Sequence, residues 1–242
     1  MKRFLSISAV LLLALGLLST LPALAAGKLA MQEEKLIYYE DFDGMTHFKY
    51  SAVVKNTGKD TTTMLESSFR LLAKGGVVLF ETDGHLDMYP QALQPGDTGV
   101  ISLDGILPEG KTKKSVTGHK LQLNWADEAF PIIVRFPAAA EYAVINEDDP
   151  DILLAGILVE VSNNTDSPVF DLRYAAILRD QKGKLLTTLY DDVLDVGVPS
   201  GGKLLMRNFI DHYLEAYMRE NNMTPGSVEV FAFTQMYDDY FY

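Results

Sequence analysis

The chain has 242 residues, a formal net charge of −12 at pH 7 and no cysteine. Such an acidic composition disfavours nucleic acid and anionic membranes as partners, because both attract clustered cations. The lack of cysteine excludes disulfides, thiol catalysis and the lipid anchor that bacterial lipoproteins carry on a cysteine.

Residues 1–25 have the pattern of a secretory signal peptide: a short basic start, an almost wholly apolar run over residues 4–18, and small residues at Ala23 and Ala25. We expect cleavage after Ala25 and a secreted or extracytoplasmic mature chain. An uncleaved anchor is the alternative, but the apolar run is short for a membrane span of about 20 residues. No later run approaches that length, so we expect no membrane span after cleavage.

Two segments about a hundred residues apart share one layout, because residues 53–76 fall on residues 160–183 when the chain is shifted against itself. The coincident positions are Asn56 and Asn163, Leu71 and Leu178, and Gly76 and Gly183. Self-similarity at one spacing indicates a duplicated unit. We therefore expect one domain over residues 26–140 and a second over residues 141–242, with a linker near residues 137–141.

Within each expected domain the hydrophobic pattern has a period of two. Tyr50, Ala52 and Val54 alternate with Lys49, Ser51 and Lys55, as in a strand with one buried face. Turn-forming Asn and Gly residues separate this strand from the next ones. Several short strands with such spacing are typical of a β-sandwich. The predicted fold is mostly β, with two tandem immunoglobulin-like β-sandwich domains.

One segment departs from this pattern. Residues 206–221 place apolar residues at three-, four- and seven-residue spacings, which indicates a helix. The sequence Thr224-Pro225-Gly226 ends it and leads into a final strand. We expect a short helix that packs on the second sandwich, with a partner-binding helix as the alternative.

The layout resembles the FxLYD family of small exported bacterial β-sandwich domains, in two degenerate tandem copies. The first copy keeps the Phe and Leu of the naming motif at Phe69 and Leu71, and the second keeps its Leu and Asp at Leu178 and Asp180. Neither copy keeps the Tyr. The resemblance implies the sandwich fold and supplies no catalytic residue.

The sequence lacks the usual motifs of catalysis. It has no Gly-x-Ser-x-Gly nucleophile elbow and no Gly-rich phosphate loop after a strand. The four histidines form no His-x-x-x-His pair, so zinc has no local signature; they are His47, His85, His119 and His212. We expect no catalytic residue and no bound cofactor, with Ca²⁺ as the exception considered next.

Acidic loops at corresponding places in the two halves are weak candidates for a Ca²⁺ site. Their carboxylates are Asp41, Asp43, Asp148, Asp149 and Asp151. Clustered hard oxygens could hold Ca²⁺ where the two domains meet, but the later ligands of a calcium loop are missing. A solvated acidic loop without metal is the alternative.

The C-terminal tail is rich in aromatic residues and is a weak candidate for a binding surface. Its candidates are Tyr237, Tyr240, Phe241 and Tyr242. Tyrosine is common at interfaces because it offers apolar area with a polar tip. The alternative is a tail that folds back onto the sandwich.

Together these patterns predict an exported, noncatalytic binding or scaffold protein of the bacterial cell envelope or extracellular space. The expected partner is a protein or glycan of the cell envelope, and nucleic acid is not expected. Two alternatives stay open: a glycan-binding module or glycan-active enzyme, and a calcium-stabilised adhesin fragment. The first predicts opposed carboxylates or an aromatic platform.

Overall fold

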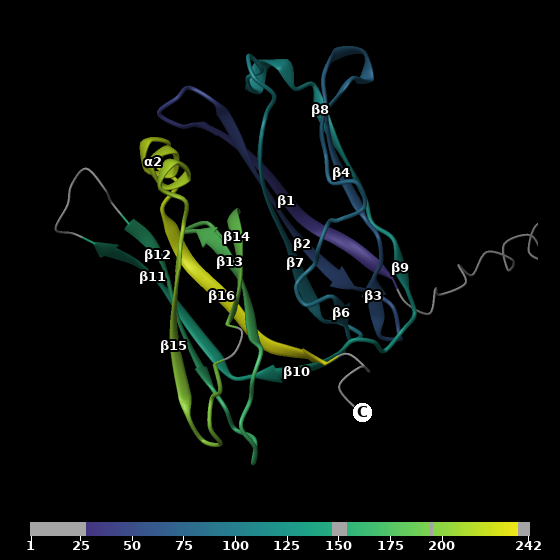
Figure 1. The fold of residues 1–242 in the computed structure, drawn as a ribbon, viewed down its shortest axis with the longest axis vertical. Helices are drawn as coiled ribbons and strands as arrows, with labels where there is room; N and C mark the ends of the chain where they lie inside the picture. Colours follow the sequence, from purple (N-terminus) through teal and green to yellow (C-terminus); the bar gives the residue numbers. More distant parts are fainter. Residues whose placement is uncertain (1–27, 147–153, 194–195, 237–242) are drawn as a thin grey trace, which may run out of the picture.

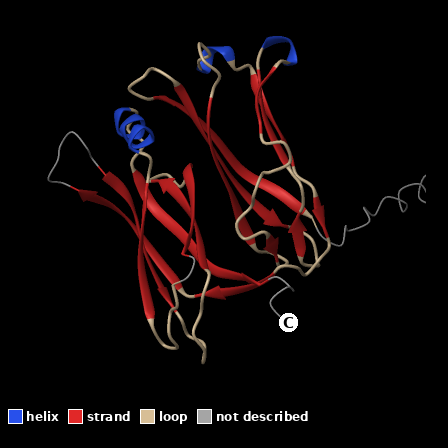
Figure 2. Ribbon diagram, viewed as in Figure 1, coloured by secondary structure: helices blue, strands red, loops and turns tan. Residues whose placement is uncertain are grey.

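The computed structural model describes residues 28–146, 154–193 and 196–236 and is almost entirely β (Figures 1 and 2), which confirms the predicted mostly-β class. The elements in chain order are β1 (Leu29–Glu40), β2 (Thr46–Asn56), β3 (Thr62–Met64), β4 (Ser68–Leu72), η1 (Lys74–Gly76), β5 (Val78–Glu81), β6 (Ala92–Leu93), β7 (Thr98–Ile106), η2 (Lys113–Ser115), β8 (Gly118–Gln122), β9 (Trp125–Ala126), β10 (Ile132–Phe136), β11 (Ala138–Asn146), β12 (Leu154–Ser162), β13 (Leu172–Asp180), β14 (Leu185–Val193), β15 (Lys203–Phe209), α2 (His212–Glu220) and β16 (Pro225–Met236). The predicted signal peptide lies outside the described residues. Within them, no helix is long and apolar enough to span a membrane.

The described strands form antiparallel sheets that stack in four layers, seen edge-on in Figure 1. The outer layer of the first half contains the sheet β5-β4-β8 and the small sheet β6-β3-β9. Next come β1-β2-β7 and then β10-β16-β13-β14. The sheet β11-β12-β15 forms the outer layer on the opposite side.

Each pair of neighbouring layers encloses an apolar cluster. In the first half the inward side chains of β2 and β4 meet, with Phe48, Tyr50, Phe69 and Leu71 fully buried. The second cluster joins β12, β13 and α2, and also includes Ile37 of β1. Strand alternation explains this burial, because every second side chain of a strand points to the same face.

A third cluster joins the two inner sheets. Its buried members are Val53, Val100, Ala175, Ile177, Leu185 and Phe233. Hydrogen bonds accompany this apolar contact: the Thr188 amide donates to Ser51 Oγ over 3.0 Å, and Thr188 Oγ1 donates to the Ile101 carbonyl over 2.8 Å. The two halves therefore pack through a largely apolar face in which these buried hydroxyls have partners.

The two halves repeat the same order of strands. Sheet β1-β2-β7 corresponds to β11-β12-β15, and β5-β4-β8 corresponds to β14-β13-β16. Residues 115–125 match residues 227–237 in sequence, which would put Phe233 at the place of Leu121. The register of the last strand differs from this match by three residues. Leu121 faces Phe69, whereas Val230, and not Phe233, faces the corresponding Ala176.

A buried asparagine ends the central strand of the first half. Asn56 Nδ2 donates to the carbonyls of Asp60 and Leu93, over 2.8 and 2.9 Å. Its Oδ1 accepts from the Gly58 amide over 2.9 Å. One side chain thus fixes the turn after β2 and joins it to β6.

Asn163 makes corresponding contacts at the end of β12. Its Nδ2 donates to the carbonyls of Ser167 and Val198, over 2.8 and 2.9 Å, and its Oδ1 accepts from the Thr165 amide over 3.0 Å. A further bond reaches the carbonyl of Pro199. The asparagines that coincide in the sequence therefore have the same role in the structure.

The helix is present but begins later than its apolar spacing predicts. Lys203–Phe209 is strand β15, and α2 starts at His212. Asp211 is the N-cap, because its Oδ1 accepts from the amides of Tyr213 and Leu214, each over 3.0 Å. Met206 and Phe209 thus fit the predicted helical spacing but belong to a strand.

The predicted boundary after residue 140 falls within β11. The preceding strand, β10, pairs with β16, so its partner lies at the far end of the chain. If the chain is divided according to which strands pair, β10 belongs with the second half, and the boundary lies before Ile132. Local sequence could not show this, because the pairing joins segments about a hundred residues apart.

Candidate ligand-binding site

A cavity of about 350 Å³ lies where the two halves meet at one end of the stack. Figure 1 shows the β1–β2 hairpin, helix α2 and the loop that contains η2 around this end. The residues that line it are Tyr38, Tyr39, Glu40, Thr46, Lys113, Tyr213, Ala216, Tyr217 and Glu220. Four tyrosines, two carboxylates and one ammonium group thus come together from three segments.

Helix α2 positions two of the tyrosines. Leu214 and Met218 are buried in the core of the second half, which fixes the rotation of the helix. Tyr213 and Tyr217, four residues apart, then lie together on one face and reach the cavity. Both are partly exposed, so their rings remain accessible.

Asp41 organises the hairpin that forms the opposite wall. Its Oδ1 accepts from the amides of Asp43 and Met45, and its Oδ2 lies 2.8 Å from His47 Nε2. The bond with His47 holds the pKa of Asp41 below its ordinary value. The His47 ring lies parallel to Tyr39 at 5.5 Å, so the hairpin is braced beside the cavity.

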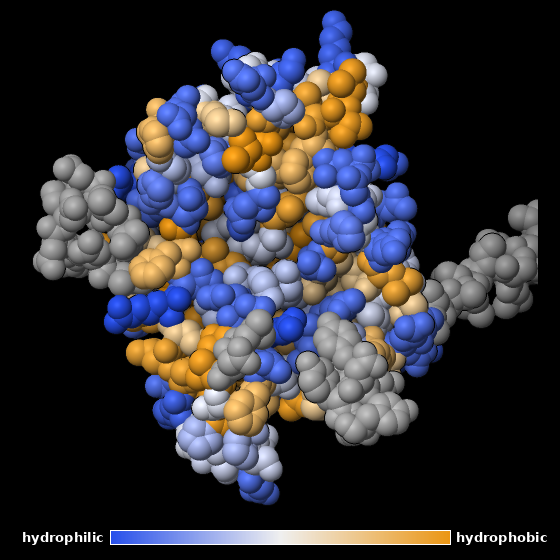
Figure 3. Space-filling model, in the orientation of Figure 1, coloured by the Kyte–Doolittle hydropathy of each residue, from blue (hydrophilic) through white to orange (hydrophobic). Residues whose placement is uncertain are grey.

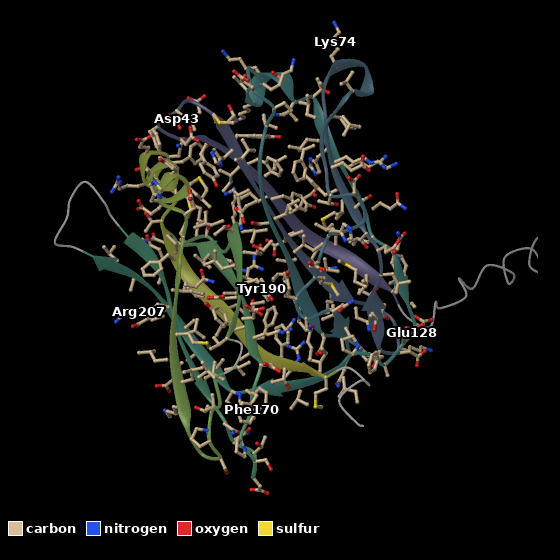
Figure 4. The ribbon with its side chains drawn as sticks, viewed as in Figure 1. Asp43, Lys74, Glu128, Phe170, Tyr190 and Arg207 are labelled. Atoms are coloured by element: carbon tan, nitrogen blue, oxygen red, sulfur yellow. The ribbon has the colours of Figure 1, made fainter. Side chains whose placement is uncertain are left out.

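The hairpin also contacts the helix through aromatic rings. The ring centres of His47 and Tyr213 are 6.5 Å apart, and those of Phe42 and Tyr213 are 6.1 Å apart. Figure 4 shows the labelled Asp43 at this hairpin, next to α2. The first half and the helix of the second half therefore make the cavity jointly.

Thr46 is the most unusual residue of this wall. Its side chain is 3% exposed, and its hydroxyl has no hydrogen-bond partner within the described chain. A buried hydroxyl without a partner lowers stability, because it loses its bond to water and gains none in return. The oxygen has less than 1 Å² of accessible surface, so it is sealed behind the wall of the cavity and is not open to a ligand in this conformation.

Two tyrosines of the cavity, Tyr38 and Tyr39, stay neutral near neutral pH. Burial raises the pKa of Tyr38 to about 12 and that of Tyr39 further. Their phenol groups therefore keep the proton that they can donate. Glu40, Glu220 and Lys113 are exposed at the rim and can accept or donate further hydrogen bonds.

Replacing Thr46 by valine should raise the free energy of unfolding of the unliganded protein by about 1 kcal/mol, because valine removes a buried polar atom that has no partner. Urea unfolding of the mature chain measures this change. Thr63→Val is the matched control, since the equally buried Thr63 hydroxyl contacts the carbonyls of Glu128 and Phe130. The control should lose about 1 kcal/mol. A similar loss in Thr46→Val would contradict the assignment of an unpartnered hydroxyl.

The metal candidates predicted from the sequence are only partly placed. Asp41 is used within the hairpin, and Asp43 is exposed at its tip. Asp148, Asp149 and Asp151 lie outside the described residues. Among the residues that are described, no group of three or more His, Asp or Glu side chains could hold a metal ion.

The predicted aromatic surface, Tyr237, Tyr240, Phe241 and Tyr242, also lies outside the described residues. Sequence reasoning missed the tyrosines of the cavity, although two signals were present. Tyr38 and Tyr39 are adjacent at the end of a strand, and Tyr213 and Tyr217 have helical spacing. Nothing local indicates that these two pairs meet.

Comparisons with known proteins leave the chain without an assigned family: no family model matches it, and no curated protein matches its sequence significantly.

Proposed function

We propose that the chain is an exported, noncatalytic binding protein of the bacterial cell envelope or extracellular space, and that its ligand is a saccharide held between the β1–β2 hairpin and α2. The observation that carries this proposal is the cavity in which tyrosines of both halves meet, Tyr38 and Tyr39 from β1 and Tyr213 and Tyr217 from α2. Export is inferred from the N-terminal pattern.

The chemistry of the cavity favours a neutral ligand with many hydroxyl groups. Tyrosine rings offer flat apolar faces for the C–H groups of a sugar ring, and their phenol groups offer hydrogen bonds. The rim carries Glu40, Glu220 and Lys113, so charges of both signs partly cancel. The volume lies near the lower end of ligand pockets, which suits a short saccharide or the end of a longer one.

Binding is favoured over hydrolysis. A glycosidase needs two carboxyl groups that flank the bond, one of them held protonated by a buried environment. Glu40 and Glu220 both line the cavity, but both are exposed. We therefore favour a glycan-binding module over a glycan-active enzyme.

The architecture that we propose is a duplicated sandwich similar to FxLYD domains. The corresponding contacts of Asn56 and Asn163 and the shared strand order support duplication. The calcium-stabilised adhesin stays an alternative, because three of its five carboxylates lie outside the described residues. It predicts that EDTA lowers the melting temperature of the mature chain.

A binding experiment tests the proposed function. The mature chain, screened against an array of bacterial envelope glycans and then titrated by calorimetry with the best soluble oligosaccharide, should bind saturably. Tyr217→Ala should weaken this binding about tenfold, because it removes one stacking face. The control is Phe170→Ala, which removes an exposed aromatic ring far from the cavity. Absence of binding across the array, or equal loss in both variants, would refute the proposal.

A further inference from the structure

The outer face of the sheet β11-β12-β15 carries large apolar side chains that no described residue covers. Leu205 is 64% exposed and Phe209 is 47% exposed. Figure 3 shows hydrophobic residues gathered over β15 at the margin of the molecule, and Figure 4 shows Arg207 projecting away from the other layers. This surface, here called the outer face, is separate from the saccharide cavity.

Strand pairing arranges the outer face in rows across the sheet. The first row is Ala143, Gly156 and Phe209; the second is Glu141, Leu158 and Arg207; the third is Ala139, Glu160 and Leu205. In every row the residue of β11 differs in size or charge from the residue of β15. The residues of β11 are small or acidic, whereas those of β15 are large and apolar or positively charged.

The corresponding face of the first half is covered. Strands β2 and β7 occupy the places of β12 and β15, and their residues Ser51, Val53 and Val100 are 1%, 4% and 0% exposed against the second half. A face of this type is thus built to pack on another sheet. In the second half it carries larger apolar residues, and no part of the described chain covers it.

The opposite end of the stack does not suit the outer face. The sheet β5-β4-β8 presents the ion pair of Arg70 and Glu81 and, in the same row, the exposed Lys120. Front-to-back stacking of two molecules would press Leu158 and its neighbours against these charges, which would lose water without new partners. A front-to-back filament is therefore disfavoured.

We propose that the outer face docks a second copy of this chain, related by a two-fold axis that runs parallel to β12. This axis places β15 of one copy over β11 of the other and keeps each row opposite itself. Arg207 then faces Glu141 of the second copy, Phe209 faces Ala143, and Leu205 faces Ala139. Leu158 meets its own equivalent at the centre.

Size matches in the first and third rows, where each large side chain of β15 faces a small one of β11, and charge matches in the second row, where each Arg207 faces a carboxylate. In the third row Glu160 meets its own equivalent, and each of these carboxylates keeps its ion pair with Lys203 over 2.6 Å. Two antiparallel sheets that pack face to face keep their strands within about 30° of each other, which preserves this match best at the central row. The result is an isologous interface of the type most common among homodimers.

The interface is small. A strand spacing of about 4.8 Å and a rise of about 3.3 Å per residue give a face roughly 15 Å by 25 Å. This footprint of roughly 375 Å² per copy is well below the roughly 800 Å² per partner of a standard specific interface, so the contact belongs to the weak, transient class. We therefore expect dissociation in the micromolar range, and the experiment must extend from low micromolar to submillimolar concentrations.

Sedimentation velocity of the mature chain tests the proposal by charge exchange. Glu141→Arg alone and Arg207→Glu alone each place like charges opposite one another twice, and each should weaken dimerisation about tenfold or more. The double variant restores the opposite pairing and should regain most of the affinity. Glu109→Arg, which changes an exposed loop carboxylate of the first half, is the control and should leave dimerisation unchanged.

Leu205→Glu provides a second, independent test, because a charge opposite Ala139 cannot be desolvated there. It should leave the protein monomeric with an unchanged circular dichroism spectrum. A wild-type chain that stays monomeric at submillimolar concentration would overturn the proposal. So would a dimer that tolerates Leu205→Glu, or a double charge exchange that fails to restore what the single changes lose.

Discussion

Replacing Asn163 by alanine should lower the free energy of unfolding by about 3 kcal/mol, and replacing Asn56 should lower it by about 2 kcal/mol. Both side chains are fully or almost fully buried, with exposures of 2% and 0%. Each truncation removes several hydrogen bonds and leaves buried carbonyl groups without a donor. Asn163 has the larger expected effect because it also contacts Pro199.

Denaturant unfolding at constant pH measures both changes. Asn164→Ala is the matched control, because this neighbouring asparagine is exposed and should change stability by less than about 0.5 kcal/mol. Similar values for Asn163→Ala and Asn164→Ala would mean that the side-chain network does not hold the turn.

Gly156→Ala should destabilise the protein by about 3 kcal/mol or prevent folding. A Cβ on Gly156 would overlap the carbonyl oxygen of Asn208 and lie 3.0 Å from the Cα of Phe209, both on the paired strand β15. Backbone atoms cannot move aside as a flexible side chain can. Strands β12 and β15 would have to separate locally and lose ladder hydrogen bonds.

Gly118→Ala is the control for this change. Gly118 also lies in a strand, β8, but a Cβ there would meet nothing within 4 Å. Alanine should be neutral or slightly stabilising at this position, because it restricts the unfolded chain. Thermal unfolding of both variants separates the steric effect of the added Cβ from the general effect of replacing a strand glycine by alanine. Equal melting temperatures would exclude close strand approach as the reason for Gly156.

Local patterns predicted the parts of the fold that local chemistry determines. The period of two around Tyr50 indicates a strand with one buried face, and Asn56 and Gly183 mark turns because their backbone and side-chain preferences act within a few residues. The resemblance between residues 53–76 and 160–183 reflects these requirements. The structure adds that Asn56 is anchored to Leu93 in β6 and Asn163 to Val198 in the segment before β15.

Features that depend on distant pairing were not predicted. The role of β10 follows from its bonds to β16, and the true start of α2 follows from β15 pairing with β12. Asp211 was the available signal for the helix start, because aspartate before an apolar helical pattern favours an N-cap. The apolar spacing of Met206 and Phe209 obscured it.

The candidate site was missed for the same reason. Tyr39 and Tyr217 belong to segments that lie far apart in the sequence, and only the packing of β1–β2 beside α2 brings them to one cavity. The expectation that function lies where the two halves differ still points to this place, since α2 stands where the first half has only the short η2. Sequence patterns could predict the helix but not the β1–β2 hairpin that it packs beside.

Calorimetric titration of Tyr217→Ala and of Phe170→Ala with the saccharide that the wild-type chain binds tests the central claim most directly. Tyr217→Ala should bind about tenfold more weakly and Phe170→Ala should bind like the wild type, because only Tyr217 lines the cavity. Equal affinities of the two variants, or a wild-type chain that binds no saccharide, would contradict the account.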